Sequence, residues 1–470
     1  MGVNDLNLRH YSRYIWFLLI VAVCCWCASR WNVWFENPEE GAYEPSKVPT
    51  RVLLTFGEEN GENSRNVSWT CGKDVKKSYV ELMDISGKDD LKHSPSIHPS
   101  QLIPATGEVF ESRSGRAAYY VARLRNLKAG HIYRYRVCTG GKKSDWHEFH
   151  LSQSHEQETS FLYMGDIQDS IGGIANQLLK KAFRQNPDAA FFVCGGDLTE
   201  RPTDAYCGET FESLDSIGQT IPVLTITGNH DYLKGIICQL ERRFSLIHSY
   251  FLDSMVGENQ VFTVRYQNMQ LFCLDSNREF FYLWTQRQWL EEQLAKSEAK
   301  WKIVVLHHPL YSIRGNTNNL IQRWMFNGLI QQYDVDVVLQ GHEHAYARMT
   351  SPKPSTLNSK PSTPVYTVSH CSPKSYRIEF DERFDKFGTG SRYYQKVHTK
   401  GDTLFLTAWD ANEGTLYDSL LIINRQGSKV VKDYGKDIPE KLTFTPNPDN
   451  KKDVAFAERI QEYKQRKHIK

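Results

Sequence analysis

Five short apolar segments of this chain each end on a side chain that binds metal ions. The segments FLYMGD, FFVCGGD, VLTITGN, IVVLH and VDVVLQGHEH end on Asp166, Asp197, Asn229, His307 and the pair His342 and His344. A short β-branched run followed at once by glycine is typical of a buried strand that ends in a tight loop. Functional groups of α/β sheets collect where such strands end. The pattern therefore predicts one cluster of carboxylate, amide and imidazole groups at a sheet edge.

This set of side chains also indicates which ions the cluster would hold. A carboxylate that can bridge two cations, an amide oxygen and several imidazoles suit Fe, Zn or Mn better than a lone Ca²⁺. Two such ions, about 3.5–4 Å apart, can clamp a phosphate and generate hydroxide at neutral pH. The layout therefore predicts a binuclear metal centre in a hydrolase.

The rest of the chain divides into segments of different character. Residues 1–30 are expected to be a signal peptide or N-terminal anchor, 31–48 a mobile linker rich in Pro, Gly and Glu, 49–153 a β-sandwich of short alternating strands, 159–425 an α/β domain, and 426–470 a C-terminal tail with a terminal helix. The tail is expected to be a solvated helix, with contact to lipid or a polyanion as the minority alternative. The net charge of +2 gives no broad basic field, so nucleic-acid binding is not indicated.

The N-terminus points to export from the cytoplasm. Arg9 and Arg13 precede an apolar stretch from Tyr14 to Cys27 that small residues follow, which is the pattern of an export signal. The stretch is shorter than the ~20 residues of a membrane-spanning helix, and an uncleaved anchor remains an alternative. In an oxidising compartment, Cys71 with Cys138 and Cys207 with Cys238 are plausible disulfides.

Five motifs, GDIQD, GGDLTE, GNHD, LHHPLY and GHEHAY, occur in this order after the expected strands. In this arrangement they resemble the calcineurin-like metallophosphoesterase superfamily. The preceding segments VPTRVLLTFG, VSWTC and LRNLKAGHIYRYRV resemble the fibronectin-III-like N-terminal domain of purple acid phosphatases. The resemblance implies a two-sheet α/β/β/α catalytic sandwich behind an all-β domain, and hydrolysis of phosphate esters.

The resemblance also implies roles for individual residues. Asp197 would bridge two ions, Asn229, His307 and His342 would complete one site, and Asp166 and His344 would hold the other ion. His230 would contact the phosphate and act as the leaving-group acid, while a metal-bound hydroxide attacks phosphorus in line.

Two positions depart from the family pattern. Purple enzymes have a metal-binding Tyr where this chain has Glu200, and related non-purple members have a His where it has Gln168. The third ligand beside Asp166 and His344 is expected to be Glu200, with Gln168 or Asp169 as alternatives. Because the Tyr is replaced, we expect no purple colour.

The loop after LHHPLYS departs as well, because plant-type relatives have a pair of histidines where this chain has Arg314 to Thr317. Arg314 is a candidate bidentate phosphate ligand, and an exposed loop arginine is the alternative reading. His308, beside His307, is the competing polar contact.

Together these features predict an exported phosphatase that hydrolyses monoesters of phosphorylated small molecules. A phosphodiesterase or nucleotide pyrophosphatase on the same fold is one alternative, and a metal-poor adhesion protein with a decayed site is another. Anchoring by the N-terminal segment and homodimer formation are further expectations that the sequence leaves open.

Overall fold

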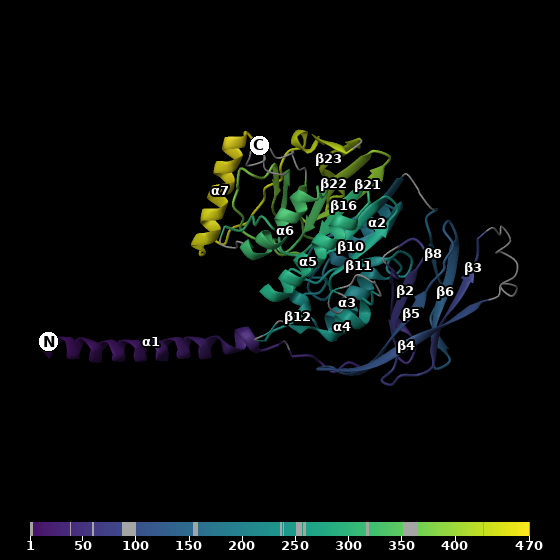
Figure 1. Cartoon of the computed structure of the whole chain (residues 1–470), viewed down its shortest axis with the longest axis horizontal. Coiled ribbons are helices and arrows are strands. Elements are labelled where there is room, and N and C mark those ends of the chain that lie inside the picture. The colour runs from purple at the N-terminus through teal and green to yellow at the C-terminus, as the bar shows by residue number, and fades with distance from the viewer. Residues whose placement is uncertain are drawn as a thin grey trace.

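A computed structural model describes residues 3–469 except 38, 59–60, 87–99, 154–157, 236, 238, 251–255, 257–259, 316–318, 351–363 and 426, together with all side chains in that range but those of 3–13 and 33. Three parts follow one another along the chain (Figure 1): a long N-terminal helix, a β unit, and a larger domain with helices on its outer faces.

The described residues of the β unit form eight strands: β1 (Thr50–Phe56), β2 (Arg65–Thr70), β3 (Ser78–Asp84), β4 (Gln101–Ser112), β5 (Gly115–Leu124), β6 (Ile132–Thr139), β7 (Lys142–Lys143) and β8 (His147–His150). Strand β4 pairs with β3 through its first residues and with β5 through the rest, so it runs from one layer into the other. Alternate side chains of the two layers, such as Val80 and Leu82 opposite Trp69, form one buried core. This arrangement matches the predicted β-sandwich.

In the larger domain, the part of the chain that the structure describes forms two seven-stranded sheets. The first has the order β11-β10-β9-β21-β22-β23-β24, and the second has the order β14-β15-β16-β17-β19-β18-β20. The strands of the first sheet are β9 (Glu158–Met164), β10 (Ala189–Cys194), β11 (Val223–Thr225), β21 (Tyr393–Lys400), β22 (Thr403–Asp410), β23 (Thr415–Arg425) and β24 (Ser428–Asp433). Those of the second are β14 (Phe262–Tyr266), β15 (Met269–Cys273), β16 (Trp301–Val305), β17 (Val337–Gln340), β18 (Tyr346–Thr350), β19 (Val365–Val368) and β20 (Lys386–Gly388). A separate hairpin pairs β12 (Tyr232–Leu233) with β13 (Gln239–Leu240).

Helices α2 (Ala175–Gln185), α3 (Asp204–Leu214), α5 (Phe280–Lys296) and α6 (Leu320–Gln332) cover the outer faces of the two sheets, whereas α1 (Val3–Phe35) extends away from the domain (Figure 1). The remaining helices of the described residues are α4 (Arg242–Ile247) and α7 (Lys451–Lys467), with short 3-10 turns η1 (Asn229–Asp231) and η2 (Gly435–Asp437). Helices α2 and α3 pack on the first sheet, and α5 and α6 pack on the second. This confirms the predicted α/β/β/α architecture.

Strand β9 shows why its sequence forms an inner strand of such a sandwich. Its side chains alternate between faces, as in any β-strand. Phe161 and Tyr163 face the core between the two sheets, whereas Leu162 and Met164 face the helical layer. Both faces are therefore apolar, which explains an uninterrupted apolar run where a one-sided strand would alternate.

Helix α1 extends away from the folded domains (Figure 1) and is longer than the sequence suggested. Its apolar window covers Tyr14–Asn32, 19 residues of mean hydropathy 1.6, and none of this window is buried against the protein. By length and composition this helix can cross a membrane, so the estimate of a shorter apolar stretch was wrong. A signal sequence near an N-terminus meets the same criteria.

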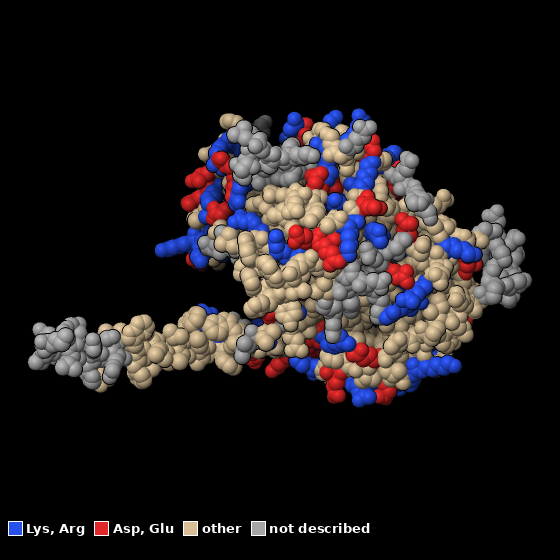
Figure 2. All heavy atoms as spheres, in the orientation of Figure 1, with Lys and Arg blue, Asp and Glu red and all other residues tan. Residues whose placement is uncertain are grey.

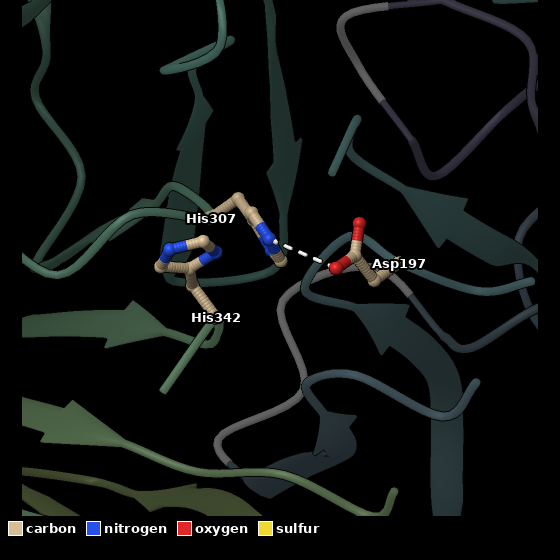
Figure 3. Close-up of side chains that lie close together, drawn as sticks. All are labelled: Asp197, His307 and His342. Atoms are coloured by element: carbon tan, nitrogen blue, oxygen red, sulfur yellow. Dashed lines mark ion pairs between the residues drawn. The ribbon is translucent and has the colours of Figure 1, made fainter. Parts of the chain in front are cut away.

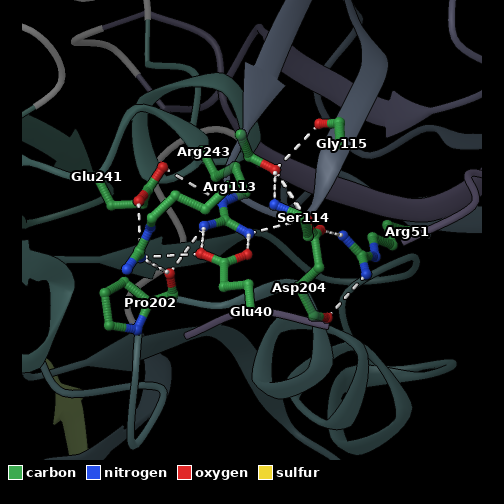
Figure 4. A network of polar contacts seen from close by, with 10 residues as sticks. Glu40, Arg51, Arg113, Ser114, Gly115, Pro202, Asp204, Glu241 and Arg243 are labelled. Carbon is green, nitrogen blue, oxygen red and sulfur yellow. Dashed lines mark hydrogen bonds and ion pairs between the residues drawn. The ribbon is translucent and has the colours of Figure 1, made fainter. Parts of the chain in front are cut away.

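The expectation of a mobile linker over residues 31–48 was also wrong, because this segment is held in a buried ion network. The Glu40 side chain is 1% exposed and pairs with Arg243 at 2.5 Å, and Arg243 also pairs with Asp204 at 2.7 Å. Arg51 of β1 reaches the same Asp204 at 2.7 Å. The network in Figure 4 therefore joins the linker, the β unit and the α/β domain through α3 and α4.

One of the two predicted disulfides can be compared with the structure, and it does not form. Cys71 and Cys138 are both free and buried. The backbone of Cys71 bonds to Ala118 of β5, whereas Cys138 lies opposite Tyr79 of β3. The proposed Cys71–Cys138 disulfide is therefore wrong, and the second proposed pair involves Cys238, which lies outside the described residues.

The C-terminal tail forms the expected helix, but its apolar face is not solvated. Phe456, Ile460 and Tyr463 of α7 are buried in the core around the second sheet, and the Tyr463 ring stacks on Phe380 at 4.3 Å. The helix therefore packs as part of the α/β domain, which corrects the expectation of a solvated tail.

His248, at the end of α4, makes stability depend on pH. Burial lowers its pKa from 6.5 to about 3 in the folded protein. The unfolded chain thus binds this proton more readily, and stability falls as the pH drops below about 6.5. We expect His248→Phe to remove about 2 kcal/mol of the loss in unfolding free energy between pH 7 and pH 5. Urea unfolding at both pH values checks this, with His150→Phe, exposed on β8, as control; an unchanged pH dependence in His248→Phe would contradict it.

Candidate metal centre

The six side chains singled out in the sequence converge from the ends of five strands. Asp166, Asp197 and Asn229 follow β9, β10 and β11 of the first sheet; His307 follows β16, and His342 and His344 follow β17, in the second. Because parallel strands end at one edge, two stacked sheets bring these loops together. Asp166, Asp197 and His342 have positive φ angles of 45°, 50° and 67°. Strained backbone of this kind at non-glycine residues clusters at functional sites.

Asp197, His307 and His342 form the centre of the cluster (Figure 3). One ligand atom of each lies within 4.8 Å of the others, and His307 Nε2 is 3.3 Å from Asp197 Oδ2. The Asn229 amide oxygen lies 3.2 Å from His307 Nε2 and 2.9 Å from His342 Nδ1. Four side chains of the types that bind metal ions therefore meet in one small space.

The electrostatics of this space favour a positive charge. His307 Nδ1 donates to the Gly195 carbonyl at 2.9 Å, which fixes the ring and leaves Nε2 facing Asp197. Burial alone would lower the pKa of His307, but Asp197 and Asp166 raise it above its ordinary value. Burial and the neighbouring histidines lower the pKa of His342, so this ring is neutral with a lone pair available. The donor set thus fits a cation.

Asp166 and His344 form a second group beside the first. His344 Nε2 lies 3.3 Å from Asp166 Oδ1, while Asp166 Oδ2 accepts the His342 backbone N–H at 2.5 Å. Gln168 Nε2 is 3.3 Å from the same His344 nitrogen. Among the described residues, neither Asp166 Oδ1 nor Gln168 Oε1 has a hydrogen-bond partner, although both are buried. Buried oxygens without partners are costly, and a bound cation is one kind of partner that carboxylate and amide oxygens accept.

The structure does not support Glu200 as the third ligand of this group. Both Glu200 carboxylate oxygens bond to Lys374 Nζ, at 2.6 and 2.7 Å. Asp169 is also engaged elsewhere, because it accepts the backbone N–H groups of Ser170 and Ala175. Gln168 was predicted only as an alternative ligand. It is the residue of the three whose side chain lies next to His344.

His230 and His308 occupy different places around the cluster. The His230 backbone N–H bonds to Asp197 Oδ1 at 2.8 Å, and its ring Nδ1 donates to the Glu200 carbonyl at 2.6 Å. The other ring nitrogen, Nε2, lies 3.9 Å from Asp197 Oδ2. His308 bonds to Ser276 Oγ at 3.0 Å and lies against the His342 ring. Burial and the adjacent His307 lower the pKa of His308 to about 3, so it is a neutral contact.

Arg314 lies beside the second group. Its guanidinium sits 4.3 Å from the centre of the Tyr376 ring, and that ring stacks on His344 at 4.3 Å. Glu343, between the two candidate ligand histidines, accepts Ser312 Oγ at 2.5 Å and the Ile313 N–H at 2.6 Å. The loop that carries Arg314 is therefore tied to the same strand-end loop as His342 and His344.

Sequence reasoning missed the loop after β19. His370 is buried and parallel to His344 at 5.4 Å, and Lys374 and Tyr376 of the same loop contact Glu200 and His344. The signal was present, because VYTVSH is another β-branched run that ends on a histidine. None of the five motifs includes this run, so sequence reasoning did not single it out.

A cavity of about 540 Å³ opens beside the cluster. It is lined by site residues Asn229, His230 and Glu200, by Arg201, Pro202, Tyr232 and Lys234, and by Asn32, Glu36, Asn37 and Glu39 from the end of α1 and the segment after it. The site is therefore accessible from the side on which α1 leaves the domain.

Comparison with known proteins agrees with this architecture. Residues 159–346 match the family described as Calcineurin-like phosphoesterase, and residues 49–151 match Purple acid Phosphatase, N-terminal domain. The chain is 24% identical over 320 residues to a phosphoenolpyruvate phosphatase of Allium cepa, covering 64% of this chain and 63% of that relative. It is 28% identical over 321 residues to purple acid phosphatase 22 of Arabidopsis thaliana, covering 64% and 67%.

Among solved structures, purple acid phosphatase PPD1 from yellow lupin (Lupinus luteus) seeds shares the fold with a TM-score of 0.68 and 17% identity, covering 81% of this chain and 75% of that one. The structure of PhoD follows with a TM-score of 0.59 and 12% identity, covering 91% and 100%. The matched region spans less than two thirds of the Allium cepa relative.

Residues 159–346 thus match a calcineurin-like phosphoesterase domain in sequence, and the fold of the chain agrees with that match. All six converging side chains lie inside the matched phosphoesterase region. The chain thus carries a calcineurin-like phosphoesterase domain behind the N-terminal domain of purple acid phosphatases.

Proposed function

We propose that this protein hydrolyses phosphate monoesters outside the cytoplasm with two metal ions. The observation that carries the proposal is the meeting of Asp197, His307 and His342 at the ends of strands from both sheets. Asp197 would bridge the ions, Asn229, His307 and His342 would hold one, and Asp166, His344 and Gln168 would hold the other. Ions of this kind supply positive charge to phosphoryl oxygens and lower the pKa of a water molecule.

The chain's own residues would orient the ester and move the proton. His230 donates through Nδ1 to the Glu200 carbonyl, which leaves an Nε2–H of the protonated ring free to reach the departing alkoxide. Its Nε2 is 3.9 Å from Asp197 Oδ2, so the proton donor would lie beside the proposed bridging ligand. Arg314, whose guanidinium lies over the Tyr376 ring that stacks on His344, would bind two phosphate oxygens.

Two chromogenic esters test the proposed reaction. Nitrophenyl phosphate should be hydrolysed with a higher kcat/KM than bis-nitrophenyl phosphate. The reason is that Arg314 would bind two oxygens of a terminal phosphate, while His230 would protonate its leaving group. The reverse preference would establish the phosphodiesterase alternative. Turnover of neither ester, with less than about one metal ion per chain after reconstitution, would favour the binding-protein alternative.

Arg314→Ala should lower kcat/KM for nitrophenyl phosphate by about 10- to 100-fold, since a charge-assisted bond to phosphate is lost. Steady-state kinetics at matched metal content measure the effect. Arg377→Ala is the control, because Arg377 is 42% exposed and pairs with Asp453 of α7. Unaltered kcat and KM in Arg314→Ala would exclude the proposed phosphate contact.

Gln168→Ala should weaken binding of one of the two ions by about tenfold or more, whereas Glu200→Gln should not. Metal analysis after titration with a chelator separates the two variants. Equal loss of metal from both variants, or loss only from Glu200→Gln, would restore Glu200 as the ligand.

The metal-loaded wild-type protein should show no intense tyrosinate-to-iron absorption band, whichever of the two residues is the ligand.

We also propose that α1 directs export and remains as a membrane anchor. The segment directly after its apolar window belongs to the folded domain, because the Asn37 side chain bonds to the Lys234 carbonyl and Glu40 is buried with Arg243. An α1 that stays in place would hold the α/β domain close to the membrane surface. Recovery of the intact chain in the membrane fraction after alkaline extraction would support retention, and a soluble chain without α1 would contradict it.

A further inference from the structure

The first turns of α5 and α6 expose an unusual number of large apolar side chains. Together they form what we call the aromatic face, which consists of Phe280, Phe281, Tyr282, Trp284, Leu320, Ile321 and Trp324, each 42–82% exposed. The Trp324 ring stacks on Phe280 at 6.0 Å and lies 6.2 Å from Trp284, so the two helices present one continuous surface. Exposed apolar patches of this kind mark interaction sites.

Acidic side chains are absent from the first turns of α5 and α6, which carry the aromatic face. Helix α6 has none in its whole length. Arg278 lies 3.7 Å from the centre of the Tyr282 ring and pairs with Glu279, directly before α5, at 3.3 Å. Figure 2 shows a mostly tan surface at the position of α5 and α6, extending toward α1. Aromatic rings with arginines suit the headgroup region of a bilayer.

The aromatic face borders the candidate metal centre. Helices α5 and α6 follow β15 and β16, so both begin at the sheet edge where the ligands converge. His308 bonds to Ser276, just before α5, and the Asn319 side chain at the start of α6 donates to the Pro309 carbonyl at 2.7 Å. Whatever covers the aromatic face therefore lies next to the site.

The end of α1 lies on the same side of the domain. It lines the cavity beside the site together with Tyr232, and the Tyr232 hydroxyl donates to Asp275, a few residues before α5. In Figure 1 α1 leaves the α/β domain on the side where β12 and α5 are labelled. A membrane crossed by α1 would thus be within reach of the aromatic face.

We propose that the aromatic face rests in the headgroup region of the bilayer that α1 enters, and that the site acts on phosphate monoesters of membrane amphiphiles. The docking of the aromatic face on the bilayer depends only on α1 and the exposed rings. The assignment of the substrate rests on the proposed function, because it narrows the substrate to phosphate monoesters whose phosphate projects from a bilayer.

Photolabelling tests the docking face without relying on catalysis. The full chain is reconstituted in vesicles of phosphatidylcholine and phosphatidylserine that include a lipid with a photoactivatable acyl chain, and labelled peptides are mapped by mass spectrometry. We expect label in α1 and in the segments 280–284 and 320–324. Leu102 and Val430, which are 57% and 51% exposed on β4 and β24, should stay unlabelled. Label in α1 alone, or crosslinks that join two copies through α5 and α6, would overturn the proposal.

Kinetics test the substrate class. The double variant Phe281→Glu and Trp324→Glu should lose about tenfold or more of its kcat/KM on phosphatidic acid in vesicles, and less than about twofold on nitrophenyl phosphate in solution, because charged groups are expelled from the interface. The matched control is Leu102→Glu and Val430→Glu. An equal effect on both substrates would overturn the substrate assignment. If the wild type labels as expected but hydrolyses neither ester, the proposed function fails and the docking face stands.

Discussion

Asp197→Asn is expected to lower kcat/KM for nitrophenyl phosphate by at least about a thousandfold. The carboxylate faces His307 at 3.3 Å and accepts the His230 backbone N–H, so it serves both the metal ligands and the proposed acid. Loss of one preorganised donor alone costs about 10²–10³ in rate, and the amide would also weaken metal binding. Steady-state kinetics together with metal analysis measure both effects.

The same substitution at a distant carboxylate serves as the control. Asp402→Asn changes a side chain that is 56% exposed and pairs with Lys300 at the far end of β22. Its activity and metal content should match the wild type. If Asp197→Asn kept both its metal and its activity while melting like the wild type, the assignment of the centre would be wrong.

Arg243→Met is expected to destabilise the protein by about 3–5 kcal/mol. Its guanidinium is 1% exposed and pairs with Glu40 and Asp204, which are 1% and 4% exposed, so the substitution leaves two buried carboxylates without their shared cation. Burial would raise the pKa of Asp204, but Arg243, Ser114 and Arg51 lower it. Urea unfolding measures the loss.

The neighbouring residue provides a matched control for this prediction. Arg242 precedes Arg243 in α4, but it is 37% exposed and pairs with Glu108, which is 49% exposed. An exposed pair contributes about 0–1 kcal/mol, so Arg242→Met should change stability little. Equal losses from both substitutions would mean that the buried network does not fix the linker in place.

Most of the fold was predictable because local patterns matched the tertiary environment. FLYM and FFVC are apolar on both faces because β9 and β10 lie between a helical layer and a second sheet. The convergence of Asp197, His307 and His342 followed from the same logic, since strand ends share an edge. The order of the five motifs along the chain made the family resemblance specific, which no single motif could do.

The failures had a different physical origin. Glu40 lies in a stretch whose composition is typical of a spacer, and only tertiary contact with Arg243 makes it a buried residue. Glu200 has a suitable carboxylate at the expected position, but Lys374, 174 residues further along the chain, binds it. His370 faces His344 through a loop that no motif marks. Each depends on a distant partner that sequence spacing does not reveal.

The burial of Glu40 limits where the proposed enzyme can work. Only a short segment separates Asn32, the last residue of the apolar window of α1, from this locked glutamate. A protein tethered by a long flexible chain could sample substrates far from its own membrane. A catalytic domain fastened almost directly to its anchor instead meets only what passes along the surface in which it is embedded, so esters on an opposing membrane would be beyond its reach.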